Sequence, residues 1–265
     1  MTATPVAIMG GMGRMGATLI RLAGEDPGLK VVGVLEREER LGELKVACTD
    51  CLVGSLEGNV LAKLPGAVVI DFTSPESTLK LAETARTSGN PLVVGTTGLN
   101  AAQQEQLAGA ARDIPVFWAP NMSVGVNVLL DILPRLSDML GPAYDIEIVE
   151  THHRHKKDAP SGTAVKLSQV LCQAREWDPE QAVRACREGI IGARPDQEIG
   201  VQTLRGGDVV GEHTVFFFGP GERIEVTHRA HSRETFAQGA LRAAKWLETQ
   251  RPGKLYTMAD MVAAH

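Results

Sequence analysis

Residues 150–163, Glu-Thr-His-His-Arg-His-Lys-Lys-Asp-Ala-Pro-Ser-Gly-Thr, place six consecutive basic or potentially basic side chains just before a helix-start signal. Clustered cations repel one another, and a bound anion relieves that repulsion. Ser161 suits an N-cap, and a helix after it would direct backbone N–H groups and the positive end of its dipole at the same place. The segment therefore predicts a carboxylate or phosphate site that contains titratable imidazoles.

A second candidate site follows the first aliphatic run of the chain. Gly10-Gly11-Met12-Gly13-Arg14-Met15-Gly16 comes after residues 6–9 and before a helical pattern, which favours a tight turn with backbone amides against a pyrophosphate. Glu36 lies 20 residues after Gly16, at the end of the second expected strand, where an acid binds ribose hydroxyls. Arg14 and Arg37 are placed to pair with a 2′-phosphate instead. NADH and NADPH both stay open as cofactors.

Two later loops fall at the ends of further expected strands. Gly95-Thr96-Thr97 follows residues 92–94, and Ala119-Pro120-Asn121-Met122 follows residues 116–118. In open α/β sheets, ligands bind beyond the carboxyl ends of the strands. We therefore expect both loops to flank the nicotinamide of the cofactor.

The first half of the chain alternates aliphatic runs with amphipathic stretches. The runs cover residues 6–9, 31–35, 68–70, 92–94 and 116–118, and the stretches cover residues 17–23, 78–88 and 101–111. Each run is apolar throughout, as in strands that are buried on both faces. The pattern predicts an α/β fold, a Rossmann-type doubly wound parallel sheet.

After about residue 124 the pattern changes. We expect, in order, a helix over 127–140, a strand over 145–150, a helix from Ser161, and strands over 213–218 and 223–228 bracketed by hairpin-type turns at 206–208 and 219–222. This predicts a second α+β domain built on a mixed, largely antiparallel sheet. The expected domains are residues 1–123, completed by 233–265, for dinucleotide binding, and residues 124–232 for substrate binding and oligomerisation.

Composition narrows the classes of partner. The chain has 265 residues, 43% of them hydrophobic, and 27 basic against 32 acidic groups give a net charge of −5, which offers no overall attraction to nucleic acid or an anionic membrane. No apolar run approaches the roughly 20 residues that span a bilayer, and no signal-peptide pattern is present. We expect a cytoplasmic protein whose partners are small molecules or copies of itself.

Metal chemistry is disfavoured. Cys48 and Cys51 form a C-x-x-C, but the other two cysteines are isolated, so the spacing of a zinc site is not met and we expect reduced thiols. Adjacent His152 and His153 would point to opposite faces of a strand, and the neighbouring cations would repel zinc. No metal is therefore expected, which disfavours a metallohydrolase. A catalytically silent NAD(P)H sensor stays open as an alternative.

Seven motifs, taken in order, resemble those of the 4-hydroxy-tetrahydrodipicolinate reductase (dihydrodipicolinate reductase) family of bacterial lysine biosynthesis. They lie at residues 10–16, 71–73, 95–98, 121–127, 150–163, 207–214 and 227–233. The resemblance runs over nearly the whole chain, and the basic segment is its most specific part. Pro120, Met122 and His231 depart from the residues common in the family, which are Ala, Phe and Ser.

The resemblance implies reduction of a cyclic, doubly carboxylated imine by NADH or NADPH to give tetrahydrodipicolinate. It implies His152 as the acid/base residue and Lys156 as a proton donor that also faces a carboxylate. It further implies that the two carboxylates are held by His153, Ser161, Gly162, Thr163 and Arg233. Family members are typically tetrameric, so a homotetramer is expected, and the hydroxylated and dehydrated substrates both stay open.

The two-residue repeat of a strand determines which side chains of the basic segment could act together. If the chain stays extended after residue 150, His152 and Lys156 share one face. We interpret His155 and His213 as buried or capping histidines without a chemical role. Closure of the two domains is also expected, because the hydride donor and the acid/base residue lie in different segments.

Overall fold

The structure is a computed structural model that describes residues 3–44 and 51–264. It divides into two compact units, unit 1 (Met1–Val124 and Glu234–His265) and unit 2 (Gly125–Arg233). Cys48, half of the C-x-x-C, lies outside the described residues. No helix in the described part of the chain is long and apolar enough to cross a membrane.

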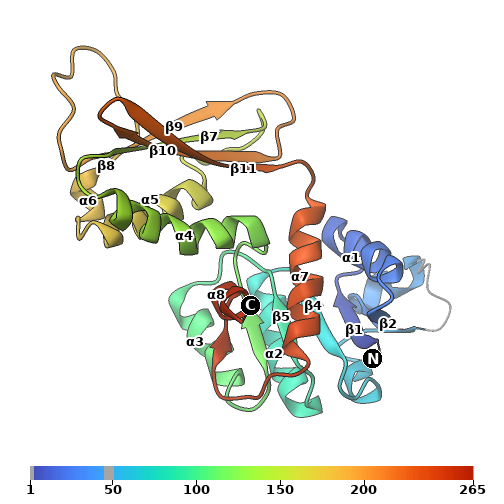
Figure 1. Cartoon of the computed structure of the whole chain (residues 1–265). Coiled ribbons are helices and arrows are strands. Elements are labelled where there is room, and N and C mark those ends of the chain that lie inside the picture. Colours follow the sequence, from blue (N-terminus) through green and yellow to red (C-terminus); the bar gives the residue numbers. More distant parts are fainter. Residues whose placement is uncertain (1–2, 45–50, 265) are drawn as a thin grey trace. The chain divides into compact units, whose positions relative to one another are not determined.

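Unit 1 is built on a parallel sheet (Figure 1). Among the described residues its strands are β1 (Thr4–Met9), β2 (Leu29–Leu35), β3 (Leu52–Gly54), β4 (Val68–Asp71), β5 (Leu92–Val94), β6 (Val116–Trp118) and β12 (Leu255–Tyr256). Their order is β12-β6-β5-β4-β1-β2-β3, and every neighbouring pair is parallel. Apart from β12, this is the strand order of Rossmann dinucleotide-binding folds, which confirms the predicted fold class.

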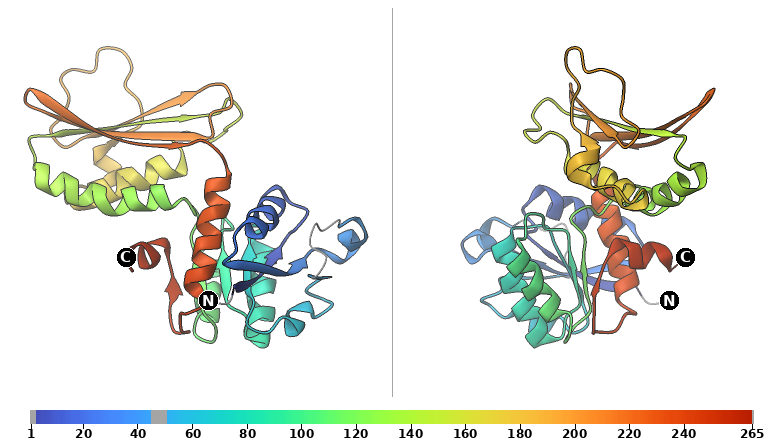
Figure 2. Two further views of the ribbon diagram at one scale, coloured as in Figure 1. Left: turned by 45° about the vertical axis from the view of Figure 1, so that its right-hand side comes forward. Right: turned by 90° about the vertical axis from the view of Figure 1, so that its left-hand side faces the viewer.

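Helices cover both faces of this sheet (Figures 1 and 2). They are α1 (Arg14–Glu25), α2 (Pro75–Ser88), α3 (Ala101–Ala110), α7 (Glu234–Leu247) and α8 (Met258–Ala263), with 3-10 turns at Glu38–Glu43 and Val60–Lys63. Ile8 of β1 packs in the cluster that contains α1 and α7, whereas Ala7 packs in the cluster that contains α2 and α3. Burial on both faces explains why these strands are apolar without interruption.

The strand order reverses between β1 and β4. From β1 the chain passes through α1 to β2 on one side, and from β4 it passes through α2 to β5 on the other. The loops after Met9 and Asp71 therefore diverge at the carboxyl edge of the sheet. Ligands of open α/β sheets bind at this kind of switch point.

Unit 2 carries a mixed sheet, and all of its residues lie in the described part of the chain. The strands are β7 (Asp145–His152), β8 (Val183–Arg184), β9 (Ile199–Arg205), β10 (Gly211–Gly219) and β11 (Glu222–Ala230). In the order β11-β10-β7-β9-β8, the pairs up to β7 are antiparallel and the pairs beyond it are parallel. The predicted mixed sheet is confirmed, with its antiparallel part confined to β11, β10 and β7.

The turn at Gly206-Gly207-Asp208 is not a hairpin, and this prediction was wrong. The turn leads from β9 to β10, and β7 lies between those strands. The N–H of Gly206 donates to the carbonyl of His152 at 3.0 Å, and the N–H of Arg154 donates to the carbonyl of Gly207 at 3.2 Å. The connection therefore crosses the carboxyl end of β7 and is bonded to it. The turn at residues 219–222 does join two neighbouring strands.

Helices cover one face of the unit 2 sheet (Figure 1). They are α4 (Val124–Leu140) and α5 (Gly162–Ala174), with the short α6 (Pro179–Ala182) following. Leu133 of α4 and Leu167 of α5 share an apolar cluster with Ile148 of β7. Alternate residues of a strand face the same side, so Glu150 and His152 continue the face of Ile148 toward the helices.

Candidate functional site

The glycine-rich loop of unit 1 has the geometry that a dinucleotide needs. Gly10 has a φ of 74°, a conformation that favours glycine. A Cβ at Gly16 would lie 2.1 Å from the carbonyl oxygen of Gly10, so only glycine allows this approach. Gly13 is the N-cap of α1 and offers no side chain that could cap it. Backbone N–H groups at this helix start thus fit a pyrophosphate.

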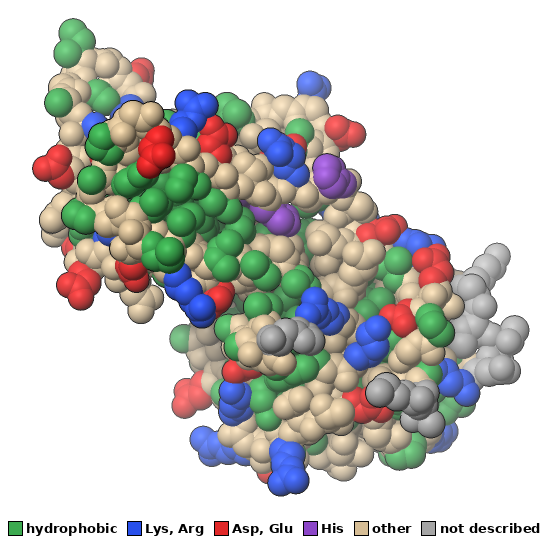
Figure 3. Space-filling view, in the orientation of Figure 1, with side chains coloured by type: hydrophobic (Ala, Val, Ile, Leu, Met, Phe, Trp, Pro, Cys, Tyr) green, Lys and Arg blue, Asp and Glu red, His purple; other side chains and the backbone are tan. Residues whose placement is uncertain are grey.

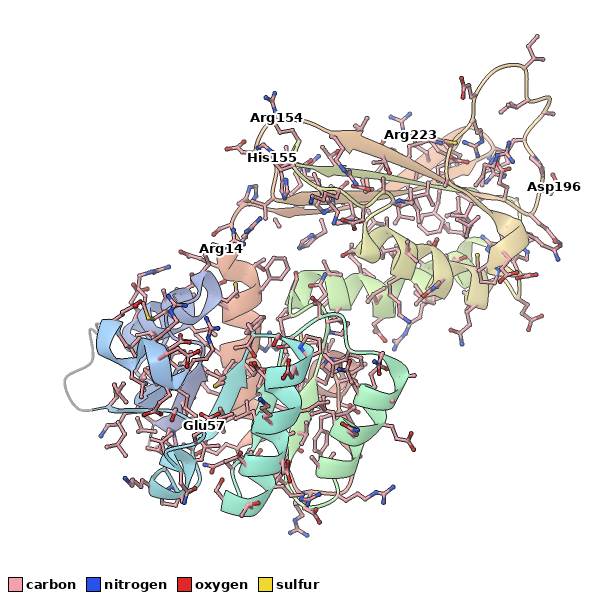
Figure 4. The ribbon with its side chains drawn as sticks, turned by 180° about the vertical axis from the view of Figure 1, so that it is seen from behind. Arg14, Glu57, Arg154, His155, Asp196 and Arg223 are labelled. Atoms are coloured by element: carbon pink, nitrogen blue, oxygen red, sulfur yellow. The ribbon has the colours of Figure 1, made fainter. Side chains whose placement is uncertain are left out.

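Glu36 lies at the end of β2, where only 6% of the residue is exposed. Its carboxylate accepts the N–H of Met12 at 3.1 Å and the N–H of Arg37 at 3.1 Å. The carboxylate therefore sits against the glycine-rich loop, where ribose hydroxyls bind in this fold class. The side chains of Arg14 and Arg37 are exposed, and Figure 4 marks Arg14 at the first turn of α1.

Asp71, which was not among the predicted site residues, joins the loops that follow β4 and β5. It is fully buried and accepts hydrogen bonds from the hydroxyls of Thr73 at 2.6 Å and Thr96 at 2.8 Å. The N–H of Thr73 also donates to the hydroxyl of Thr96 at 3.0 Å. Burial raises the pKa of Asp71, and the hydroxyls bonded to it oppose that rise. Gly95 is buried in the same loop, whereas Thr97 is exposed.

The loop after β6 presents some of the predicted residues and buries others. Pro120 is exposed and Asn121 is half-buried. The Met122 side chain is 1% exposed and belongs to the core of unit 1, as does Ala119. A Cβ at Gly239 of α7 would lie 1.8 Å from the carbonyl oxygen of Met122. Ala119 and Met122 can therefore offer a cofactor their backbone rather than their side chains.

Glu150 is the centre of the candidate site in unit 2. Its Oε2 lies 2.6 Å from Nδ1 of His152, and its Oε1 accepts the N–H of Ser161 at 2.9 Å. Arg205 of β9 donates to the two carboxylate oxygens at 2.8 and 2.9 Å, and the hydroxyl of Thr203 donates at 3.1 Å. One fully buried carboxylate thus joins two strands to the start of α5.

The neighbours of Glu150 decide its charge. Burial alone would raise the pKa of Glu150, but hydrogen bonds from Arg205, His152 and Ser161 lower it to about 2. Burial lowers the pKa of His152, and the charge of Glu150 opposes that shift. Near neutral pH, the carboxylate is therefore ionised and the imidazole is mostly neutral.

His213, interpreted from the sequence as a structural histidine, is buried within this cluster. Its Nε2 lies 2.9 Å from the hydroxyl of Ser161, and its ring packs edge-on against His152 with 5.2 Å between centroids. Burial, and then the nearby His152, lower the pKa of His213 to about 4. The hydroxyl of Ser161 also accepts the N–H of Ala164 at 3.2 Å as the N-cap of α5. A neutral imidazole thus fixes the cap of this helix.

The basic segment is not extended, so the condition under which His152 and Lys156 would share one strand face is not met. β7 ends at His152, and the N–H of Lys156 donates to the carbonyl of His153 at 3.1 Å, which closes a turn. The ammonium of Lys156 pairs with Asp158 at 2.8 Å. The crossing connection after β9 occupies the end of β7, and the chain turns away there.

The other predicted residues of unit 2 are more accessible. Arg154 and His155 lie in the loop that leaves β7 (Figure 4), and His155 is exposed rather than buried. Gly162 is exposed and Thr163 is half-buried in the first turn of α5. Arg233 is exposed in the segment that leads from β11 to α7.

The structure gathers predicted residues into one group within each unit. The glycine-rich loop and Glu36 lie together in unit 1, and His152 and Ser161 are joined through Glu150 in unit 2. The sequence reasoning missed Glu150 and Arg205. A strand period of two would have placed Glu150 beside His152, but the position of Arg205 depends on a strand register that the sequence does not display.

Neither the surface charge nor the metal-ligating side chains of the described residues point to further site residues beyond the two groups named above. On the face drawn in Figure 3, acidic and basic side chains are interspersed over the described residues. Within residues 3–44 and 51–264, no group of three or more His, Cys, Asp or Glu side chains could hold a metal ion.

Two family models match almost the whole chain. The model described as dihydrodipicolinate reductase, N-terminus, matches residues 4–122, and the model described as dihydrodipicolinate reductase, C-terminus, matches residues 125–262. A relative from Nitratidesulfovibrio vulgaris (strain DP4), named 4-hydroxy-tetrahydrodipicolinate reductase, is 58% identical over 97% of this chain and 99% of its own. A relative of the same name from Lawsonia intracellularis (strain PHE/MN1-00) is 49% identical over 97% of this chain and 98% of its own.

Solved structures agree with these matches. The dipicolinate-bound dihydrodipicolinate reductase from Paenisporosarcina sp. TG-14 has a TM-score of 0.76 at 25% identity and covers 96% of this chain and 97% of its own. The C. glutamicum DAP dehydrogenase in complex with DAP is similar in fold, with a TM-score of 0.55 at 13% identity. The match covers 97% of this chain and 93% of that protein. These comparisons support neither the silent sensor nor the metallohydrolase. The resemblance seen in the sequence is confirmed, and this chain belongs to the dihydrodipicolinate reductase family.

Proposed function

We propose that this protein reduces 4-hydroxy-tetrahydrodipicolinate to tetrahydrodipicolinate with NADH or NADPH, in the diaminopimelate and lysine biosynthesis pathway. The observation that carries the proposal is the Glu150–His152 pair beside the N-terminus of α5, in a chain of this family. The imidazole is an acid/base group, and the helix start offers N–H donors to a carboxylate. A reaction that protonates a ring with two carboxylates needs both an acid/base group and donors that bind a carboxylate.

Residues of unit 1 would hold the cofactor. The glycine-rich loop binds the pyrophosphate through backbone N–H groups, and the carboxylate of Glu36 binds the ribose. The loops at residues 95–97 and 119–122 lie at carboxyl ends of strands and flank the nicotinamide. The bound reduced nicotinamide supplies a hydride.

Residues of unit 2 would hold the two substrate carboxylates. Ser161, Gly162 and Thr163 contribute the start of α5, with His153 as a further ligand. Arg233 offers a guanidinium that suits bidentate binding of a carboxylate. A substrate carboxylate also competes with Asp158 for the ammonium of Lys156, because that ion pair is partly exposed.

His152 transfers the proton that completes the reduction. Once hydride has reached ring carbon C4, the electron pair moves toward the ring nitrogen and leaves an enamine, which must gain a proton on carbon. Imidazole exchanges protons readily near neutral pH, and Lys156 is a second donor in the same segment. The reduction consumes one hydride and one proton, and the hydroxylated substrate also releases water.

We further propose the division of labour and the setting. Residues 1–123 with 233–265 form the dinucleotide-binding domain, and residues 124–232 form the substrate-binding and oligomerisation domain. The protein works in the cytoplasm as a homo-oligomer, a tetramer by resemblance to its family.

Steady-state kinetics with enzymatically generated substrate test the function. We expect loss of NADH or NADPH absorbance that depends on substrate and is inhibited by dipicolinate. His152→Ala should lower kcat by about 10²- to 10⁴-fold, the usual contribution of proton transfer, without changing the Kd of the cofactor. Absence of turnover with both cofactors contradicts the proposed function, whereas a near-wild-type kcat in His152→Ala contradicts only the role of His152.

A further inference from the structure

We propose that Glu150, paired with Arg205, is the positioning residue of His152: it fixes which imidazole nitrogen carries the resting proton and where the other nitrogen points. This inference rests on the proposed function, in which His152 is the acid/base group. Glu150 itself does not touch the substrate and acts through the histidine.

The contact between the two side chains sets the tautomer. Nδ1 of His152 lies 2.6 Å from Oε2 of Glu150. An ionised carboxylate can only accept a hydrogen bond, so the proton must sit on Nδ1. Nε2 is then the nitrogen that takes up and releases the proton of the reaction.

The sheet register sets the direction of Nε2. Glu212 pairs with Thr151, so Gly211 lies directly across from His152 on β10. A Cβ at Gly211 would lie 2.9 Å from Nε2 of His152 and 3.3 Å from its Cδ2. The imidazole edge therefore occupies room that only glycine leaves, and Gly211 helps to hold its direction.

Arg205 keeps the carboxylate from taking the proton of its neighbour. It lies across from His152 on β9 and bonds both carboxylate oxygens of Glu150, so that Glu150 stays ionised. Arg205 also donates to the carbonyl of Asp158 at 2.7 Å, in the loop that carries Lys156. One ion pair thus fixes the imidazole, the start of α5 and the basic loop in relation to one another.

Several other charged or titratable groups face His152. They are Lys156 in the loop, Arg205 on β9, and His213 on β10, which itself has His228 of β11 across from it. Lys156 and Arg205 disfavour the imidazolium, and Glu150 is the anion that favours it. Removing the charge of Glu150 should therefore lower the pKa of His152 further. A glutamine amide can also donate to Nδ1, which would move the proton to Nε2.

The test compares Glu150→Gln with Glu147→Gln. Glu147 is a matched control because it also lies on β7 and pairs with an arginine, Arg187, at 2.6 and 2.8 Å, but it faces the opposite side of the sheet from His152. We expect Glu150→Gln to lower kcat by about 10²- to 10⁴-fold, with less than about a threefold change in the KM for NADH. The limb of kcat/KM that falls as pH rises should move to lower pH. Glu147→Gln should retain kcat within about threefold.

The second readout does not depend on turnover. In protein labelled with ¹⁵N-histidine, nitrogen shifts should show the proton of neutral His152 on Nδ1 in the wild type and at least partly on Nε2 in Glu150→Gln. Gly211→Ala should lower kcat while the proton stays on Nδ1. A wild-type protein with its proton on Nε2, or a Glu150→Gln variant with near-wild-type kcat and an unmoved pH limb, would overturn the proposal.

Failure of the proposed function and failure of the role inferred for Glu150 give different results. If the wild type does not reduce the substrate, the proposed function is wrong, and the wild-type tautomer still decides whether Glu150 positions His152. If Glu150→Gln does not fold, that same wild-type measurement and the kinetics of Gly211→Ala decide it.

Discussion

Buried charges in this protein are stabilised by a small number of specific partners. Glu150 is held by an arginine, a histidine and a backbone N–H, whereas the partners of Asp71 in the described part of the chain are hydroxyls and a backbone N–H. The difference shows in the direction of the pKa shifts, since that of Glu150 falls and that of Asp71 rises. A charged partner offsets burial where neutral hydroxyls do not.

The position of Glu36 leads to a prediction about cofactor choice. Glu36→Ala should raise the KM for NADH by about 10- to 100-fold, because hydrogen bonds to a carboxylate are worth roughly 1.5–3 kcal/mol. Arg14→Ala and Arg37→Ala should act mainly on NADPH, through the lost partner of a 2′-phosphate. Initial rates with each cofactor measure both effects, and unchanged KM values for both cofactors would refute this placement.

At the scale of single residues, the sequence predicted which chemistry the site carries better than it predicted which residues contact one another. The types and order of His152, Lys156 and Ser161 were enough to indicate an anion site with acid/base groups. The partners of His152 could not be found in the same way, since Arg205 and Gly211 approach it through strand pairings between distant segments. The burial of the Met122 side chain could not be found in this way either, because it packs under α7, which comes more than a hundred residues later.

At the scale of elements, close packing of α1 on the turn after β1 depends on Gly16. Gly16→Ala would place a Cβ 2.1 Å from a backbone oxygen, so α1 must shift and carry the phosphate-binding N–H groups with it. We expect a fall in thermal stability and at least about a tenfold loss of cofactor affinity. Gly24→Ala, in the same helix, is the control.

Among residues 3–44 and 51–264, nothing lies within 4 Å of the place that a Cβ at Gly24 would take. Alanine there should leave cofactor binding unchanged and stabilise the helix by up to about 1 kcal/mol. Calorimetric titration with NADH and thermal unfolding check both variants. Equal effects of the two substitutions would argue against a special role for Gly16.

The buried His213 predicts a pH dependence of stability. Its pKa is about 4 in the folded protein and 6.5 ordinarily, so the unfolded chain binds more protons between these values. Stability is therefore complete above about pH 6.5 and falls by up to about 3 kcal/mol as the pH drops toward 4. His213→Gln should flatten this part of the curve.

Urea unfolding of wild type and His213→Gln at about pH 5 and about pH 7 measures the effect. The difference between the two pH values should shrink in the variant, whatever its absolute stability. An equal difference in both proteins would mean that His213 is not the group that titrates. Glu150, with its pKa lowered to about 2, contributes to stability that is lost only below about pH 4.5.

The elements themselves were largely evident from the sequence, because apolar runs and helical periodicity are local. The turn at Gly206-Gly207-Asp208 shows where local reasoning fails. Its residues favour a tight turn, but pairing is decided by β7, which inserts between the strands that the turn connects. The basic segment bends for a related reason, since the carbonyl of Gly207 accepts the N–H of Arg154.

At the scale of the whole molecule, the sheet of unit 2 has one face covered by α4 and α5 and one face without helices (Figures 1 and 2). Phe216 and Phe218 alternate along β10 with the buried Val215 and Phe217, so they lie on that other face. Their rings stack 5.6 Å apart, and Leu204 of β9 is 54% exposed. This surface suits the self-association proposed above.

Phe218→Glu should weaken that association, because an interface would bury an unpaired charge. We expect sedimentation velocity at micromolar concentration to shift from the oligomer to smaller species. Met139→Glu, on the 85% exposed position of α4, is the control and should leave the distribution unchanged. The proposed surface is wrong if Phe218→Glu sediments like the wild type.

The way in which the chain leaves unit 1 and later returns to it also bears on biogenesis. Six buried residues of the unit 1 cluster that also contains α1 come from α7. This helix is translated only after all of Gly125–Arg233. While the ribosome makes that stretch, the nascent amino-terminal sheet lacks the helix that seals one of its faces. We therefore expect the later-made unit to mature first, and the earlier one to depend on chaperones until the final helices emerge.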